Sequence, residues 1–368
     1  MRVLIAGGGT AGHVFPALAL ARRLAASHGA EVHFAGTAGG QEATLVPEAG
    51  FPFTTVEARP LLRKVSVRAL SAPMSALASV VRCRPLVEGS DVVVGMGGYV
   101  SVPVAVAAIQ ARRPLVLHEQ NAVPGLANRA LARAARTVAL SFAEAERMFP
   151  RSARTILTGN PVREPILAVP SEREVLAKEA REELGLDADR KTVLVVGGSQ
   201  GALNLCRATV DALDRLGHRR DLQILLLTGN AHLEAVTRSL VPGREPIVRA
   251  FPFLDRMELA YAVADLVVAR AGATTIAELT VCGLPSMLIP YPYATGRHQE
   301  ANARALQRAG AATIVMDEAL TGELLAARIT DLMDDPDRLG RMAARSRTWG
   351  RPDAAETLAE AVLEAARR

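Results

Sequence analysis

The same local pattern occurs twice in this chain: a short apolar run, a cluster of glycines and then a helical stretch. The first copy is residues 3–6 followed by the glycines of 7–12, and the second is residues 191–196 followed by those of 197–201. An apolar run that ends in glycines and leads into a helix is typical of a parallel strand covered on both faces. Two copies therefore predict an α/β protein with two Rossmann-like domains, whose ligands bind at the carboxyl ends of the strands.

The length and composition of the chain agree with two domains. It has 368 residues, and its hydrophobic content of 49% is enough for two packed cores. Between 161 and 190, prolines precede a charged helical stretch that we expect to connect the domains. We therefore expect an N-terminal domain at 1–160 and a C-terminal domain at 161–344. The alanine-rich end, about 345–368, is expected to be helical and to pack back on the first domain.

Several classes of protein are disfavoured. Cys83, Cys206 and Cys282 are scattered without metal or redox spacing, so a reduced, cytosolic setting is expected. The N-terminus lacks the pattern of a signal peptide. Residues 92–111 carry no charge and are long enough to cross a bilayer, but their glycines and Pro103 favour a buried strand, a glycine turn and a buried helix.

The first glycine turn, with Gly7, Gly9 and Gly12, has the spacing of a dinucleotide-binding fingerprint. A dehydrogenase also needs an acidic residue at the end of the next strand, about 20 residues further on, to bind the ribose. The next expected strand ends in residues 34–37 without an acid, and Glu31 stands at its start. The sequence therefore disfavours a nicotinamide-dependent oxidoreductase. Neither turn is a P-loop, because no Lys-Ser/Thr pair follows the glycines.

A third glycine turn, at residues 270–278, follows an apolar run and begins a helix that Thr274 or Thr275 can cap. The amino end of that helix can bind a pyrophosphate. Glu278 lies about one turn inside. Its carboxylate can accept hydrogen bonds from the two hydroxyls of a ribose, or it can complement the helix dipole as a first-turn acid. The pattern leaves both roles open.

Seven motifs occur together and in order along nearly the whole chain. They are GGTAGH at 8–13, GMGGYVS at 95–101, HEQNAVPGLANR at 118–129, GNPVR at 159–163, GGSQGA at 197–202, GATTIAE at 272–278 and HQEANA at 298–303. As a set they resemble the MurG family, the UDP-N-acetylglucosamine transferases that convert lipid I to lipid II in bacterial peptidoglycan synthesis. The resemblance implies the GT-B fold: two Rossmann-like domains facing a cleft, with the acceptor bound mainly by the first and the nucleotide sugar by the second.

The resemblance also implies which residues contact the donor. Family members usually have glycine at the position of Ala11, which raises the question of whether the backbone there needs a positive φ. The implied contacts are Thr10, Ala11, Gly12, Asn121, Arg163 and Ser199, then Leu254 near the uracil, Ala273, Thr274, Thr275, Ile276, Ala277 and Glu278 around the phosphates and ribose, and Gln299 near the sugar.

Transfer from a UDP-sugar requires stabilisation of the departing diphosphate. Arg163 can bind it bidentately, and helix amino ends can help, which would remove the need for a metal. Two Asp-x-Asp patterns, at 187–189 and 335–337, have the letters of a metal motif but lie in turn-like contexts. We therefore expect an inverting transferase with no metal and no cofactor.

The acceptor hydroxyl must lose its proton as it attacks. His13, at the end of the first glycine turn, is the candidate general base, because histidine has a suitable pKa. The structural alternative is a histidine that only hydrogen-bonds backbone or phosphate. Glu119, at the end of the apolar run 114–119, is the rival base, and His118 can point into the sheet instead. Tyr99 is a candidate acceptor contact.

One stretch indicates a lipid surface. From 59 to 84 there are six basic residues and no acid, with an apolar helical segment between them. This suits an anionic bilayer, although an ordinary core-facing helix explains the apolar residues equally well. We expect UDP-N-acetylglucosamine, lipid I and an anionic membrane surface contacted through 59–84 as partners, no nucleic acid, and a peripheral place on the cytoplasmic face of the membrane.

Two other functions stay open. One is a GT-B enzyme with another acceptor, which the pair HEQN and GNPVR disfavours. The other is a non-catalytic nucleotide-binding protein, which would leave His13, Glu119 and Gln299 without a role.

Overall fold

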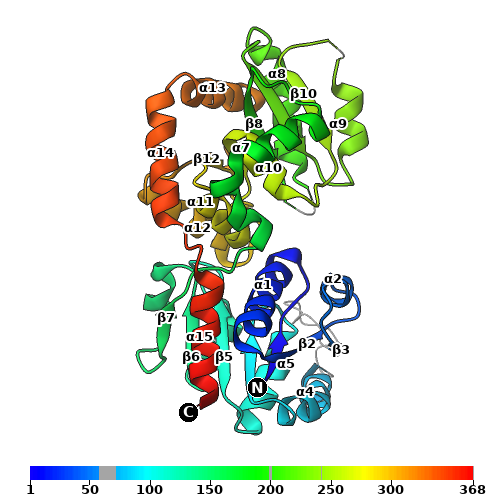
Figure 1. Ribbon diagram of the computed structural model, residues 1–368, viewed down its shortest axis with the longest axis vertical. Helices are drawn as coiled ribbons and strands as arrows, with labels where there is room; N and C mark the ends of the chain where they lie inside the picture. The colour runs from blue at the N-terminus through cyan, green and yellow to red at the C-terminus, as the bar shows by residue number, and fades with distance from the viewer. Residues whose placement is uncertain (58–71, 199–200, 242, 368) are drawn as a thin grey trace. The chain divides into compact units, whose positions relative to one another are not determined.

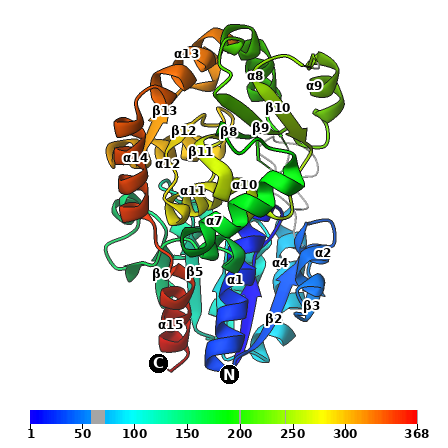
Figure 2. The ribbon, with the colours of Figure 1, turned by 45° about the horizontal axis from the view of Figure 1, so that its top comes forward.

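The chain divides into two units, each built on one parallel β-sheet with helices on both faces (Figures 1 and 2). The first unit is Met1–Arg163 together with Pro352–Arg368, and the second is Glu164–Arg351. The C-terminal helix is therefore part of the first unit although it follows the second in sequence. The structure is a computed structural model that describes residues 1–57, 72–198, 201–241 and 243–367.

The first sheet has seven parallel strands in the described residues. In their order across the sheet they are β3 (Phe53–Thr55), β2 (Glu31–Gly36), β1 (Arg2–Ala6), β4 (Val92–Gly95), β5 (Leu115–Glu119), β6 (Thr137–Leu140) and β7 (Thr155–Leu157). The chain thus builds outward from β1 to one edge and then returns to add β4 on the other side. The order reverses between β1 and β4, which is where open α/β sheets bind ligands.

Alternate side chains of β1 enter two separate cores, as the period of a strand requires. Val3 and Ile5 pack with α1, α2 and α15, whereas Leu4 and Ala6 pack with α4 and α5. Figure 1 shows α15 beside β5 and β6 on the α1 face. The helices of this unit are α1 (Ala11–His28), α2 (Glu42–Glu48), α4 (Ala72–Glu88), α5 (Ser101–Gln110), α6 (Leu126–Leu131), the 3₁₀ turn η1 (Ala143–Met148) and α15 (Ala354–Arg367).

The second sheet has six parallel strands within the same described ranges. They are, in order, β10 (Ile247–Phe251), β9 (Leu222–Leu227), β8 (Lys191–Val196), β11 (Ala264–Ala269), β12 (Ser286–Leu288) and β13 (Ala312–Ile314). Its order reverses between β8 and β11, the counterparts of β1 and β4. The two copies of the sequence pattern therefore begin two sheets of the same topology, and the expected pair of Rossmann-like folds is confirmed.

Helices cover both faces of the second sheet. On one face α8 and α13 pack on Val193 and Val195, and on the other α7, α10 and α11 pack together. These helices are α7 (Glu164–Leu184), α8 (Leu203–Leu216), α9 (Leu233–Ser239), α10 (Met257–Val263), α11 (Ala273–Cys282), η2 (Thr295–Arg297), α12 (His298–Arg308), η3 (Asp317–Ala319), α13 (Gly322–Met333) and α14 (Pro336–Trp349).

The uncharged stretch 92–111 forms β4, a glycine turn and α5, as the glycines and Pro103 predicted. Among the helices of the described ranges, none combines the length and the apolar character needed to span a bilayer.

Candidate functional site

In the first unit the turns that follow β1 and β4 are in backbone contact. A Cβ built on Gly98, whose φ is +78°, would lie 2.5 Å from the carbonyl oxygen of Gly8, and one built on Gly7 would lie 2.8 Å from Cβ of Met96. Only glycine fits at such distances. The residues of both turns are thereby brought together at the carboxyl edge of the sheet, where the order of strands reverses.

His13 lies in the first turn of α1 and faces the β4 turn. Its Nδ1 is 3.1 Å from the Thr10 hydroxyl, and a Cβ on Gly97 would lie 3.2 Å from its Nε2. The Thr10 hydroxyl therefore orients the ring, and the other ring nitrogen lies over Gly97. A side chain at residue 97 would displace the imidazole, so the glycines of GMGGYVS make room for His13 as well as for the turn.

The question about Ala11 is settled by the start of α1. The helix begins at Ala11, with Thr10 as an extended N-cap residue, so Ala11 has helical backbone angles. The positive φ of this turn belongs to Gly9, at +89°. Alanine is compatible with a first helical position, and the difference from the usual family sequence imposes no backbone strain.

Tyr99 and Arg163 complete this edge of the first unit. The Tyr99 ring lies beside Gly9, with Cε1 3.5 Å from the position of a Cβ there, and 36% of the residue is exposed. The Arg163 guanidinium stacks over Phe15 of α1, 4.3 Å from the ring centroid. A cation held over an aromatic ring keeps its planar donor edges available to an anion.

Glu119 holds the loop that follows β5. It is 3% exposed, and its carboxylate accepts from the backbone N–H groups of Asn121 and Gly125, both at 3.0 Å, and from Asn128 Nδ2 at 2.8 Å. Three donors on two oxygens make this carboxylate a loop anchor. The hydrogen bond from its N–H to Glu119 positions Asn121, one of the residues expected to contact the UDP-sugar.

His118 is fully buried in β5. Its Nε2 lies 3.1 Å from the carbonyl oxygen of Gly159 and 3.3 Å from Oγ of Ser141. Burial lowers the pKa of His118 to about 4; the hydrogen bond to Gly159 opposes this shift and the charge of His13 adds to it. The imidazole is therefore neutral at pH 7, and its position inside the sheet agrees with the inward orientation expected for it.

In the second unit the corresponding turns follow β8 and β11. Gly201 has a φ of +75°, and a Cβ there would lie 2.3 Å from the carbonyl oxygen of Thr228. Ser199, expected to contact the donor, lies outside the described residues. Leu254 is half-buried in the segment between β10 and α10.

The residue that caps the helix after β11 is not the one expected. Gly272 is the N-cap residue, with φ −64° and ψ 144°, and α11 begins at Ala273. The prediction that Thr274 or Thr275 caps the helix is therefore wrong, because the extended residue that a cap requires lies two positions earlier. Ala273, Thr274 and Thr275 form the first helical positions, whose N–H groups are those available to an anion. Ile276 and Ala277 follow in the helix, and the N–H of Ile276 already donates to the carbonyl oxygen of Gly272 at 2.9 Å.

Glu278 lies beyond the first turn of α11, which carries no acidic residue. The alternative of a first-turn acid that complements the dipole is therefore excluded. Glu278 is 6% exposed, and its Oε2 accepts from the Tyr261 hydroxyl at 2.8 Å. Tyr261, fully buried on α10, was not predicted; nothing in its local sequence distinguishes it from an ordinary core residue.

Gln299 connects two loops at the carboxyl edge of the second sheet. Its Oε1 accepts from the N–H groups of Ala271 at 3.2 Å and Tyr291 at 2.9 Å. The buried Asn302, one turn further along α12, donates to the carbonyl oxygen of Ala271 at 3.2 Å. The motif HQEANA thus positions the loop that precedes α11, and Asn302 is a second member that the sequence did not single out.

The two Asp-x-Asp patterns have structural roles. Asp187 accepts from the N–H of Asp189 at 2.9 Å and pairs with Arg190, and Asp335 caps α14 by accepting from the N–H of Arg338 at 2.9 Å. Within residues 1–57, 72–198, 201–241 and 243–367, no group of three or more His, Cys, Asp or Glu side chains could hold a metal ion.

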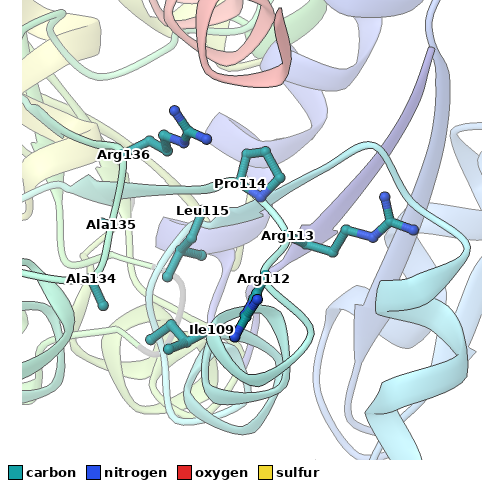
Figure 3. A pocket seen from close by; sticks show the side chains of 8 residues that line it. All are labelled: Ile109, Arg112, Arg113, Pro114, Leu115, Ala134, Ala135 and Arg136. Carbon is teal, nitrogen blue, oxygen red and sulfur yellow. The ribbon is translucent and has the colours of Figure 1, made fainter. Parts of the chain in front are cut away.

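An open pocket of about 210 Å³ lies away from these turns (Figure 3). It is at the amino ends of β5 and β6, the opposite edge of the first sheet. Three arginines surround an apolar floor; the lining residues are Ile109, Arg112, Arg113, Pro114, Leu115, Ala134, Ala135 and Arg136.

Comparison with known proteins defines the class first. Residues 3–140 match the N-terminal domain of glycosyltransferase family 28, and residues 192–358 match its C-terminal domain. The protein is therefore a glycosyltransferase, with the GT-B fold of two Rossmann-like domains that the motifs implied.

The relatives define the family. Proteins named UDP-N-acetylglucosamine--N-acetylmuramyl-(pentapeptide) pyrophosphoryl-undecaprenol N-acetylglucosamine transferase are 43% identical in Halothermothrix orenii, over the full length of both chains, and 44% identical in Anaeromyxobacter dehalogenans, over all of this chain and 94% of that one. The crystal structure of Acinetobacter baumannii MurG matches 99% of both chains with a TM-score of 0.79 and 31% identity. The chain belongs to the MurG family, as its motifs indicated.

Proposed function

We propose that the chain transfers N-acetylglucosamine from UDP-N-acetylglucosamine to the muramyl C4 hydroxyl of lipid I, with inversion and without a metal, and so forms lipid II. The observation that carries the proposal is the full-length relationship to transferases named for this reaction. The two edges described above supply groups suited to its two substrates: a histidine on the first unit, and a helix amino end with a buried carboxylate on the second.

The first unit is proposed to activate the acceptor. The C4 oxygen forms a bond to the anomeric carbon, the bond from that carbon to the UDP oxygen breaks, and the hydroxyl proton passes to His13. Thr10 orients the imidazole at Nδ1, so the proton would be taken at Nε2, over Gly97. The hydrogen bonds that occupy the Glu119 carboxylate favour His13 over Glu119 as the base. Tyr99, exposed beside Gly9, is the proposed acceptor contact.

The second unit is proposed to hold the donor. The first-turn N–H groups of α11 would bind the diphosphate, and the Glu278 carboxylate, oriented by Tyr261, would bind the ribose hydroxyls. Leu254 is assigned to the uracil and Gln299 to the sugar. Arg163 of the first unit would neutralise charge that develops on the departing diphosphate. Asn121 and residues 10–12 would stabilise the same charge by donating hydrogen bonds.

The direct test is label transfer from radiolabelled UDP-N-acetylglucosamine to a short-chain lipid I analogue, with and without chelator. We expect labelled lipid II in both cases. No transfer in either would contradict the proposed reaction, and transfer lost on adding chelator would contradict only its metal-free part. Replacing the analogue by diacylglycerol tests the alternative acceptor class, and we expect no labelled product from it.

The proposed location is peripheral, on the cytoplasmic face of the membrane. Residues 59–71 of the expected membrane stretch lie outside the described residues; of the remainder, Arg82 pairs with Glu57 and Arg84 with Glu88. A second basic surface supports the proposal. Arg112, Arg113 and Arg136, around the pocket of Figure 3, have no ion-pair partner in the described part of the chain.

Reversal of these three charges tests that surface. The triple variant Arg112→Glu, Arg113→Glu, Arg136→Glu is expected to lower partition onto vesicles containing anionic lipid by about 10-fold or more, since each cation near such a surface contributes about 1 kcal/mol. Cosedimentation with phosphatidylglycerol vesicles measures this. The matched control reverses Arg215, Arg238 and Arg244 on the second unit, which are already paired with carboxylates. Equal binding by the two triple variants would refute the assignment of this surface.

A further inference from the structure

Glu42, the first residue of α2, has its carboxylate buried behind the first glycine turn. The residue is 1% exposed, and both carboxylate oxygens accept hydrogen bonds. Oε2 accepts from the N–H of Gly9 at 2.8 Å, and Oε1 accepts from the N–H of Thr37 at 2.9 Å and from its hydroxyl at 2.8 Å. A buried charge is tolerated when its oxygens are satisfied in this way.

Three glycines make the space for this side chain. A Cβ built on Gly8, Gly36 or Gly40 would lie 2.2, 2.4 or 2.1 Å from the nearest atom of Glu42. None of the three has a positive φ, so each is needed for room and not for its backbone conformation. They come from the turn after β1, the end of β2 and the loop before α2. Three separate segments are thus shaped around one carboxylate.

The carboxylate is ionised at neutral pH. Burial raises the pKa of Glu42, but the hydrogen bonds from Gly9 and Thr37 outweigh burial and hold the pKa below its ordinary value. Its partner Gly9 is the middle glycine of the Gly-x-Gly-x-x-Gly turn, the position at which a dinucleotide-binding backbone approaches its pyrophosphate. In this chain that N–H is bonded to an anion of the protein itself.

We propose that Glu42 is the internal anion of the first glycine turn. It takes the Gly9 N–H that a phosphate would otherwise use, and it holds Gly8 and Gly9 in the position where they contact the β4 turn that lies against His13. Glu42 is thus a positioning residue that acts through the turn, and it makes Gly8 and Gly9 a support for His13 instead of a phosphate site. The effect on transfer rests on the proposed function; the anion contact itself does not.

The kinetic test uses Glu42→Gln, which keeps the shape and removes the charge. In this variant the N–H of Gly9 or of Thr37 faces the side-chain NH₂ of the glutamine in place of a carboxylate oxygen, and the turn shifts. We expect kcat for transfer to fall roughly 10- to 100-fold, with the KM for UDP-N-acetylglucosamine unchanged within about twofold, because we assign donor binding mainly to the second unit. The control is Glu48→Gln, on the exposed side of the same helix, which should match the wild type. Because partial unfolding also lowers apparent kcat at unchanged KM, kcat is expressed per folded chain, with the folded fraction measured by circular dichroism.

The contact is tested independently by NMR. Glycine labelled with ¹³C at the carbonyl and ¹⁵N at the amide selects the amides that follow another glycine. These are Gly8, Gly9, Gly40, Gly98 and Gly198. After assignment, we expect the Gly9 signal to titrate in acid with the carboxylate and to move in Glu42→Gln, while Gly198, in the second unit, stays in place.

Added anions complete the test. In Glu42→Ala, formate should restore part of the lost kcat, and inorganic phosphate should shift the Gly9 amide, whereas neither should affect the wild type. A Gly9 signal that is unchanged in Glu42→Gln overturns the proposal, as does a kcat equal to that of Glu48→Gln. If the wild-type chain shows no transfer, the proposed function fails, but the Gly9 signal still decides whether Glu42 is the anion of the turn.

Discussion

Replacement of His13 by alanine is expected to lower the single-turnover rate of sugar transfer by about 10²- to 10⁴-fold, the usual contribution of a general base. Binding of UDP-N-acetylglucosamine should change little, because the variant removes an interaction that matters only when the acceptor hydroxyl loses its proton. The fold should persist, since the His13 side chain is half-buried at the surface of the turn. Rapid-quench measurement with labelled donor and saturating acceptor separates the chemical step from binding.

His28→Ala is the matched control for this experiment. His28 is in the last turn of the same helix, where its Nε2 lies 2.9 Å from Oε1 of Glu356, a contact on the surface of the first unit. Its loss should leave the rate near that of the wild type. A His13→Ala chain that keeps more than about a tenth of the wild-type rate would contradict the base role.

The second large effect concerns stability in acid. The pKa of His118 is lowered from 6.5 to about 4 in the folded chain, chiefly by burial. Below pH 6.5 the unfolded chain binds a proton that the folded chain does not, so stability is fully present above pH 6.5 and is lost as the pH falls toward 4. A shift of this size corresponds to about 3 kcal/mol of unfolding free energy. Urea unfolding between pH 7.5 and 4 measures it.

His118→Gln isolates this contribution. The amide does not titrate and can still donate to the carbonyl oxygen of Gly159, so the fall in stability between pH 6.5 and 4 should become shallower. Part of the pH dependence of stability should remain in this variant, because burial also lowers the pKa of His33. The exposed His218 offers a control, and His218→Gln should retain the wild-type profile. An unchanged slope in His118→Gln would show that the acid sensitivity arises elsewhere.

The interior strands could be predicted from sequence, and the edge strands could not. β1, β4, β8 and β11 contain uninterrupted apolar runs, at 3–6, 92–94, 193–196 and 266–269, because both faces of the sheet are covered. The four strands without a clear signal, β3, β7, β10 and β13, are the two edges of each sheet. They are short or half-exposed. Each therefore lacks the uninterrupted buried apolar run by which an interior strand is recognised in the sequence.

The glycine turns were located by sequence, but their roles depend on contacts. Gly7, Gly9 and Gly12 match a nucleotide fingerprint, yet the Gly9 N–H is bonded to Glu42, 33 residues away. Glu119 was expected as a rival base because it ends a strand, and the structure shows it anchoring a loop. Thr274 and Thr275 are common capping residues, but the backbone is extended at Gly272 instead.

The sequence by itself determined the two parallel sheets, the turns at their carboxyl edges and membership of the MurG family. These features can be read from the sequence because each depends on the periodicity of apolar residues or on a motif formed by neighbouring positions. The contacts made after folding showed that Glu42 accepts the hydrogen bond of the Gly9 N–H, that Tyr261 donates to Glu278 and that Gln299 joins two loops. Each of these needs a partner from another element, and the position of a buried polar group is decided by which donors surround it after folding.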